Sequence, residues 1–354
     1  MLILLDCRPL QHTGAGNERS RLILSCVQWL SSCQGVKWLF VAEKGWQEEG
    51  TLPVTVPGEW VTLKALPGVA GWKLWYDWQI PRAADKYKVD MVMTTDGRAA
   101  GSMTIPQCCW MPYGRGLKKK GLPKGLDKAG AIFCFSEEDK KGMRNARIVH
   151  PAADTQAMQL LGEEKQNARA LFADGKEYFY AEITGVQFSE VIVLLKAFSM
   201  FKKRQHSNMK LVFAGTGDGP DKKFAESLES YKFREDVSWL VHPSTEERWR
   251  IPGGAYAMIY CPRHESIGLG VLNAWKAGVP VVSMAATGIQ GAGEAFLQVE
   301  KAGDAAQLAE YLKLLYKDEG LRGRLIEKGL LQTTYFSPER LGGEVWEGIS
   351  AIKS

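Results

Sequence analysis

The chain is organised around one segment, Arg263-His-Glu-Ser-Ile-Gly-Leu-Gly-Val-Leu-Asn-Ala-Trp-Lys-Ala-Gly-Val-Pro-Val-Val-Ser283. The apolar run 255–261 before it is typical of a buried parallel strand. The segment itself predicts a loop, a helix over 269–277 that ends at Gly278, and a further strand from 279 onward. Because the start of a helix favours negative charge, we expect this loop and helix to form an anion site.

The alternation of strand and helix signals continues through the whole chain. Residues 2–7 form an apolar strand signal, and a loop with Gly14 and Gly16 leads from it into a helical pattern over 22–30. Strands alternating with helices in this way are typical of parallel α/β units. The two glycines have two interpretations, which are a tight turn between strand and helix or a second loop that holds an anion.

Length and composition narrow the class of protein. With 354 residues, the chain is long for one hydrophobic core and suits two domains. A net charge of +5 and a pI near 8.7 suit a ligand with phosphates and are too weak to indicate nucleic acid. The seven cysteines are scattered, and no apolar run has the length of a membrane-spanning helix. We therefore expect a cytoplasmic protein with reduced cysteines.

Segment 263–283 resembles the donor-site signature of family 4 glycosyltransferases, which are retaining enzymes of GT-B fold. Glu265 matches the first carboxylate of that signature, and Asn273 stands where the second carboxylate is expected. Residues 277–282, Ala-Gly-Val-Pro-Val-Val, match its tail. The resemblance predicts an α/β protein of GT-B architecture, with two Rossmann-like, doubly wound domains that face a cleft.

The resemblance also implies roles for individual residues. Glu265 is the candidate catalytic residue and would contact the transferred sugar. Ile267, Gly268 and Leu269 would present backbone amides to the phosphates of a nucleotide-sugar, and the amide of Asn273 would meet the ribose. The nucleotide-sugar is a substrate, so no cofactor is expected, and the resemblance implies a metal-independent enzyme.

The first loop contributes to the same expected site. Its Thr-Gly-x-Gly turn is similar to a family turn that faces the nucleotide-sugar, which favours the ligand-binding interpretation of Gly14 and Gly16. The implied domains are an acceptor-side domain over 1–165, a donor domain over 166–336, and a helix over 337–354 that crosses back to the first domain.

Four positions depart from the family pattern. Asn273 replaces an acid, Gly291 stands where a Glu is common, and Pro112-Tyr113 stand where His-Asp is common. The fourth departure is at Ser189 and Glu190, where the family has a basic pair that holds the diphosphate. Two functions follow from the pattern. The first is transfer of a hexose-type sugar, with retention, in cell-surface polysaccharide or glycoconjugate synthesis. The alternative is a catalytically degenerate GT-B protein that acts as a binding or scaffold partner.

The expected partners are a nucleotide-sugar donor and a glycan or lipid-linked acceptor, without nucleic acid. Two stretches raise the further hypothesis of peripheral contact with the inner face of the membrane. The loop 113–124 carries Arg115 and four lysines, which is the pattern of a solvated face or of a contact with anionic head groups. The helix predicted over 71–86 is rich in Trp and Tyr, for which a core face is the simpler interpretation and a membrane interface the alternative.

Overall fold

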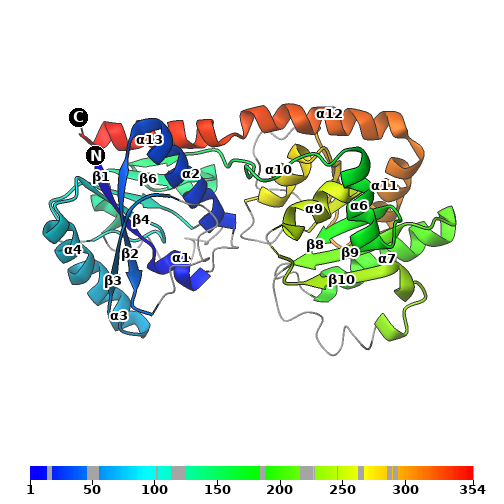
Figure 1. Cartoon of the computed structure of the whole chain (residues 1–354), viewed down its shortest axis with the longest axis horizontal. Coiled ribbons are helices and arrows are strands. Elements are labelled where there is room, and N and C mark those ends of the chain that lie inside the picture. Colours follow the sequence, from blue (N-terminus) through cyan, green and yellow to red (C-terminus); the bar gives the residue numbers. More distant parts are fainter. Residues whose placement is uncertain are drawn as a thin grey trace. The chain divides into compact units, whose positions relative to one another are not determined.

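The chain divides into two compact units in the computed structural model. Unit 1 comprises Met1–Ala152 and Ser337–Ser354, and unit 2 comprises Ala153–Phe336. Figure 1 shows the helices and strands of both units. The structure describes all residues except 14–17, 46–55, 101–102, 113–124, 184–187, 216–225, 227, 245, 262–266, 285–288, 290–293 and 354. The division falls after Ala152, so the expected boundary at residue 165 lies inside a helix of unit 2, α6 (Gly162–Ala173).

Each unit is built on one sheet, and every strand pair is parallel. The seven strands of unit 1 are β1 (Leu2–Asp6), β2 (Lys37–Glu43), β3 (Glu59–Leu63), β4 (Met91–Thr94), β5 (Gln107–Trp110), β6 (Ala131–Cys134) and β7 (Ala146–Ile148). The six strands of unit 2 are β8 (Tyr178–Glu182), β9 (Lys210–Gly215), β10 (Val237–Val241), β11 (Ala257–Tyr260), β12 (Val281–Ser283) and β13 (Leu297–Gln298). Two Rossmann-like α/β sheets are thus present, as the sequence predicts.

Helices connect these strands. In unit 1 they are α1 (Arg8–Thr13), α2 (Glu18–Gln34), α3 (Gly68–Leu74), the π-helical turn η1 (Trp75–Gln79), α4 (Ile80–Tyr87), the short helix η2 (Leu126–Lys128), α5 (Glu137–Lys140) and α13 (Pro338–Lys353). In unit 2 they are α6, α7 (Phe188–Gln205), the short helix η3 (Arg234–Asp236), α9 (Glu247–Gly254), α10 (Leu269–Lys276), α11 (Ala305–Lys317) and α12 (Glu319–Tyr335). None of the helices that the structure describes has the length and apolarity needed to cross a membrane.

The strand order reverses once in each sheet. The order is β3-β2-β1-β4-β5-β6-β7 in unit 1 and β10-β9-β8-β11-β12-β13 in unit 2. The reversals therefore fall between β1 and β4, and between β8 and β11. In open parallel sheets, ligands bind beyond the carboxyl ends of the strands at such a reversal.

Both faces of the sheet of unit 2 are buried. In β8, successive side chains point alternately into the apolar cores on the two faces. Tyr178 and Tyr180 belong to one apolar cluster, whereas Phe179 and Ala181 belong to the cluster on the opposite face. Side chains of a strand point alternately to the two faces, so a strand buried on both sides is apolar at every position. The continuous apolar runs in the sequence have this physical origin.

The C-terminal helix α13 packs against unit 1 through glycines. A Cβ on Gly342 would lie 2.2 Å from Cε3 of Trp29 in α2, and one on Gly348 would lie 2.6 Å from Cε1 of Phe133 in β6. Such contacts are far below the sum of van der Waals radii, so the helices approach this closely only because side chains are absent. The next residue, Gly343, has no atom of this kind within 4 Å of its would-be Cβ.

This pair of neighbouring glycines predicts opposite effects of one substitution. We expect Gly342→Ala to destabilise unit 1 by about 1–3 kcal/mol, because the methyl group overpacks the contact with Trp29. Gly343→Ala should be neutral or stabilise by about 0.5–1 kcal/mol, since alanine favours the helix and meets open space. Thermal unfolding of the two variants beside the parent chain measures this. Equal melting temperatures for both variants would contradict the packing.

Candidate functional site

The helix α10 of unit 2 begins beyond the carboxyl end of β11, at the reversal of strand order. Its N-cap, Gly268, has φ of +94°, a left-handed conformation that side chains disfavour. A Cβ there would also lie 2.5 Å from Cγ1 of Ile289. Glycine is therefore required at this position twice over, by the backbone angle and by the close contact. The neighbours Ile267 and Leu269 are both buried.

Two carboxylates lie at this edge of the sheet, and of these the sequence pattern indicated only Glu190. Oε2 of Glu182, the last residue of β8, is 2.9 Å from the position that a Cβ of Gly270 would take. Glu190, in the first turn of α7, is close enough for its charge to act on Cys261, the residue after β11. Burial, followed by this charge, raises the pKa of the Cys261 thiol. The edge is thus acidic, and a Glu that ends a central strand is the sequence signal for Glu182.

Asn273 has a structural partner within unit 2. Its Oδ1 accepts a hydrogen bond from the backbone N–H of Asp154 at 2.8 Å, and Nζ of Lys276 donates to the carbonyl of Asp154 at 2.8 Å. Only 6% of Asn273 is exposed. Asn273 is therefore not an exposed residue on the helix surface. The oxygen of its side-chain amide holds the backbone at Asp154, near the start of unit 2. The Nδ2 end of the amide has two N–H donors.

The structure brings four of the expected donor-site residues together. Ile267, Gly268, Leu269 and Asn273 all lie at or within the first turns of α10. Glu265, Gly14 and Gly16 lie outside the described residues. Within the described ranges, His, Cys, Asp and Glu side chains form no group of three or more that would hold a metal ion.

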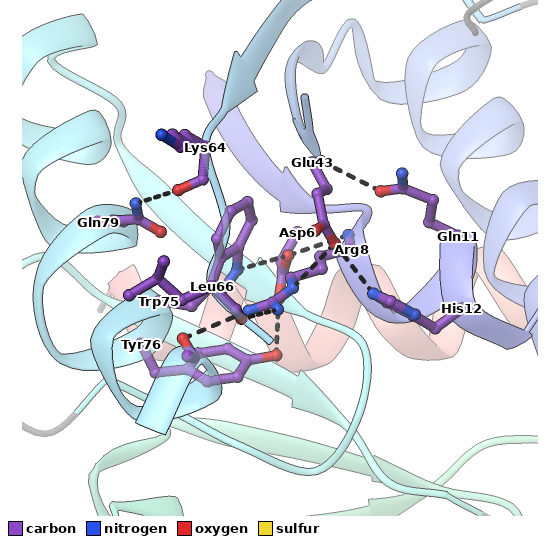
Figure 2. A network of polar contacts seen from close by, with 11 residues as sticks. Asp6, Arg8, Gln11, His12, Glu43, Lys64, Leu66, Trp75, Tyr76 and Gln79 are labelled. Atoms are coloured by element: carbon purple, nitrogen blue, oxygen red, sulfur yellow. Dashed lines mark hydrogen bonds and ion pairs between the residues drawn. The ribbon is translucent and has the colours of Figure 1, made fainter. Parts of the chain in front are cut away.

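Unit 1 has a buried polar network at its own reversal of strand order. Asp6 ends β1 and is completely buried. Its Oδ1 accepts from Nε1 of Trp75 at 3.0 Å, and its Oδ2 lies 2.7 Å from the hydroxyl of Tyr76. Figure 2 shows these side chains pointing toward one another from β1 and from the helical turn opposite. The same Tyr76 hydroxyl lies 2.8 Å from Oδ1 of Asp96, which follows β4.

The geometry around Tyr76 fixes a proton. A phenol has one proton to donate, yet its oxygen is within hydrogen-bond distance of two carboxyl groups. Both contacts are hydrogen bonds only if one carboxyl is protonated. Burial, together with the nearby charge of Asp96, raises the pKa of Asp6 to about 7. Below this pH Asp6 is the protonated partner and donates to Tyr76, while Tyr76 donates to Asp96, which is paired with Arg98.

Arg8 closes the network on its other side. Its guanidinium lies 4.0 Å from the ring centroid of Trp72 and donates through Nη2 to the carbonyl of Leu66 at 2.9 Å. Its Nε lies 3.4 Å from Oε2 of Glu43, an ion pair visible in Figure 2. Because Arg8 is only 2% exposed, its charge is balanced by this acid and by the aromatic face rather than by water.

The protonated Asp6 predicts a dependence of stability on pH. The folded-state pKa is raised, so the folded protein binds more protons than the unfolded chain between about pH 4 and pH 7. The stabilisation is complete below the unfolded-state pKa and is lost as pH rises through 7. Over this window the loss is up to about 4 kcal/mol, from about 1.4 kcal/mol per pKa unit.

The variant Asp6→Asn tests this, because its amide donates to Tyr76 as the protonated acid does. We expect the variant to gain stability relative to the parent chain as the pH rises from 5 to 8. Denaturant unfolding at several pH values gives the difference, and Asp77→Asn, on the exposed face of η1, is the control. A constant difference between Asp6→Asn and the parent at all pH values would show that Asp6 is ionised throughout.

Comparison with known proteins adds the family. Residues 185–332 match the family described as "Glycosyl transferases group 1". This region contains α7, the reversal at β11 and all of α10. No curated protein matches the chain in sequence.

Solved structures match over nearly the whole length. The glycosyltransferase from Rickettsia africae ESF-5 has 14% identity and a TM-score of 0.76, over 100% of this chain and 98% of that one. WaaG, a glycosyltransferase of lipopolysaccharide biosynthesis, has 12% identity and a TM-score of 0.68, over 98% of both chains. Anabaena HepE in complex with UDP-glucose has 11% identity and a TM-score of 0.73, over 99% of this chain and 100% of that one. The chain therefore has the GT-B fold, and its residues 185–332 match the family of glycosyl transferases group 1.

Proposed function

We propose that this protein transfers a hexose-type sugar from a nucleotide-sugar to a glycan or lipid-linked acceptor, with retention, in cell-surface polysaccharide or glycoconjugate synthesis. The observation that carries the proposal is the family match over 185–332, which includes the helix start at the reversal of strand order. The similar structures support the same direction, since HepE is described with UDP-glucose and WaaG with lipopolysaccharide biosynthesis.

The donor is proposed to bind at the start of α10. Backbone amides of Ile267, Gly268 and Leu269 would meet the phosphates, where the helix dipole favours negative charge. The Oδ1 atom of Asn273 already accepts from Asp154, so its Nδ2 group would donate to a ribose oxygen. Glu265 would contact the transferred sugar, and Gly14 and Gly16 are further candidates for donor binding.

The reaction needs little covalent participation by the protein. The bond between the anomeric carbon and the diphosphate oxygen breaks, the acceptor oxygen bonds to the same carbon, and the proton of the acceptor hydroxyl passes to the departing diphosphate. The protein must orient both substrates and stabilise the charge that grows on the diphosphate. We propose that no resident metal is required, and that the acceptor carries the protein to the inner face of the membrane when it is lipid-linked.

A binding or scaffold role is the second candidate, and a specific observation favours it. Glu182 lies beside the first turn of α10, and Glu190 stands where the family has a basic residue. Two unit charges about 4 Å apart interact by roughly 4 kcal/mol at an effective dielectric constant of 20. Acidic side chains that faced a diphosphate without a compensating positive charge would thus weaken donor binding to a degree that could abolish transfer.

Donor binding and turnover separate the two candidates. We expect one class of nucleoside diphosphate or nucleotide-sugar to raise the melting temperature, because a ligand at a hundredfold excess over its Kd adds about 2.7 kcal/mol. The screen covers UDP, GDP and ADP with their sugars, each with and without Mg²⁺. Release of nucleoside diphosphate from the same donor should then fall at least a hundredfold in Glu265→Gln while the melting shift persists. Absence of any shift would favour the scaffold role.

The charge at Glu190 gives a second prediction. We expect Glu190→Lys to lower the Kd for the diphosphate at least tenfold, since a repulsive charge becomes an attractive one. The isosteric variant Glu190→Gln should have an intermediate effect, because it only removes the repulsion. Isothermal titration with the nucleotide found in the melting screen measures all three proteins. Equal Kd values would mean that Glu190 does not face the ligand, and the argument for a degenerate site would lose its main support.

A further inference from the structure

The outer face of α3, η1 and α4 in unit 1 exposes large apolar side chains together with basic ones. The apolar members are Leu66, Val69, Leu74 and Trp78, which are 48%, 89%, 37% and 51% exposed. The exposed basic members are Lys64, Lys73, Arg82 and Lys86. We call these eight residues the apolar–basic face. Figure 1 shows α3 and α4 on the same side of the sheet of unit 1.

Helical spacing places most of these residues on one side. Val69 and Lys73 are four residues apart, as are Leu74 and Trp78 and also Trp78 and Arg82, and this is the spacing of neighbours on one helix face. The opposite stripe, with Trp75, Tyr76 and Ile80, is buried in the core of unit 1. The segment from α3 to α4 thus has one apolar stripe that is buried in the core of unit 1 and a second one that is exposed to solvent.

Within unit 1, the exposed large apolar residues are concentrated on this face. In the described part of unit 1, every exposed large apolar side chain belongs to the apolar–basic face. The five residues 66–70, Leu-Pro-Gly-Val-Ala, are all apolar or glycine and all exposed. Single exposed apolar residues need no explanation, but a contiguous group marks an interaction surface.

The apolar tip is held in place by the network around Arg8. Nη2 of Arg8 donates to the carbonyl of Leu66 at 2.9 Å, a contact drawn in Figure 2. The loop also lies directly on the helix, because a Cβ on Gly71 would be 1.7 Å from that carbonyl oxygen. Leu66 and its neighbours are therefore fixed outward, rather than able to fold onto the core.

The charge of the chain points to an anionic partner at this unit. Unit 1 contains 23 Lys and Arg against 17 Asp and Glu, a net of +6, whereas unit 2 contains 22 against 23, a net of −1. Five of these basic residues belong to the loop 113–124, which lies outside the described residues, so the positive charge of the apolar–basic face comes from its own four basic side chains. Asp77 and Asp85 are also exposed on this face, and the four basic side chains outnumber them.

Trp78 is a tryptophan, a residue type that is favoured at boundaries between apolar and polar surroundings. It is half exposed, and the guanidinium of Arg82 lies 5.1 Å from its ring centroid. Tryptophan is enriched where membranes meet water, and basic side chains beside it attract anionic head groups. Apolar anchors, a tryptophan and flanking positive charges together form the pattern of a surface that lies on a membrane.

We propose that the apolar–basic face docks on an anionic lipid bilayer, with Leu66, Val69 and Trp78 inserted at the head-group level. This inference deepens the membrane contact of the proposed function and rests on that function for its purpose. It assigns the contact to a surface that folding leaves uncovered. A lipid surface, rather than a protein, is the occupant that matches a protruding apolar tip surrounded by flexible basic side chains.

Vesicle sedimentation with the full chain tests the proposal. We expect the protein to bind vesicles of phosphatidylcholine with 30% phosphatidylglycerol, a composition chosen for the assay, and to bind pure phosphatidylcholine at least tenfold more weakly. Binding should weaken as salt rises, because the attraction to head groups is screened. Equal binding to both compositions, or none to either, would overturn the proposal.

Matched variants locate the contact. We expect Val69→Ser with Trp78→Ala to weaken vesicle binding at least tenfold, whereas Leu161→Ser with Leu331→Ser, which changes apolar residues 70% and 68% exposed on unit 2, should not. Lys73→Glu with Arg82→Glu should weaken binding by about fivefold or more for each charge, and Lys203→Glu with Lys301→Glu controls for net charge. Equal losses in the test and control pairs would contradict the assignment.

Two further measurements separate the possible outcomes. If sedimentation velocity shows a dimer that Val69→Ser with Trp78→Ala dissociates, and vesicles are not bound, the face is a self-association surface and the lipid proposal is wrong.

Donor hydrolysis in solution is measured on the same variants. Vesicle binding lost with hydrolysis intact implicates the docking face alone, whereas a protein that binds vesicles but turns over no donor contradicts the proposed transfer and leaves the docking face standing.

Discussion

Burial of both faces of a parallel sheet is the constraint from which the two units follow. Parallel strands need crossover connections, and helices on both faces supply them. Alternate residues of one strand, such as Phe179 and Tyr180, then enter different cores. Apart from its ends, such a sheet has no wet surface. Polar chemistry is therefore confined to the carboxyl edge, where the strand order reverses and neighbouring connections leave in opposite directions.

The two reversals carry different chemistry. In unit 1 the edge is closed by a hydrogen-bonded chain from Asp6 through Tyr76 to Asp96, in which the two carboxyl groups share one acidic proton beside that of the phenol. In unit 2 the edge presents a helix start with glycine at the cap, beside Glu182 and near Glu190. A helix start attracts anions and two carboxylates repel them, so the balance between these effects determines whether a diphosphate binds. This competition is local and does not depend on the fold.

The fold could be predicted from sequence because apolar runs and glycines carry its physics directly. The apolar run 255–261 predicted β11, and the segment 263–283 predicted α10 and β12. The strand β3 was not predicted, because it lies at the sheet edge and is only half-buried, so its sequence has no apolar run. The hydrogen-bond partner of Asn273 could not be predicted for another reason. Asp154 is 119 residues away, and only the folded chain brings the two together.

The C-terminal segment 337–354 belongs to unit 1, although all of unit 2 precedes it in the chain. During synthesis, unit 2 is a continuous stretch and can complete its core before translation ends. Unit 1 cannot complete its core by then, because Trp29 and Phe133 pack against glycines of α13, which is made last. The first half of the chain to emerge from the ribosome is thus the last to finish folding, and its apolar surface stays open while the rest is made.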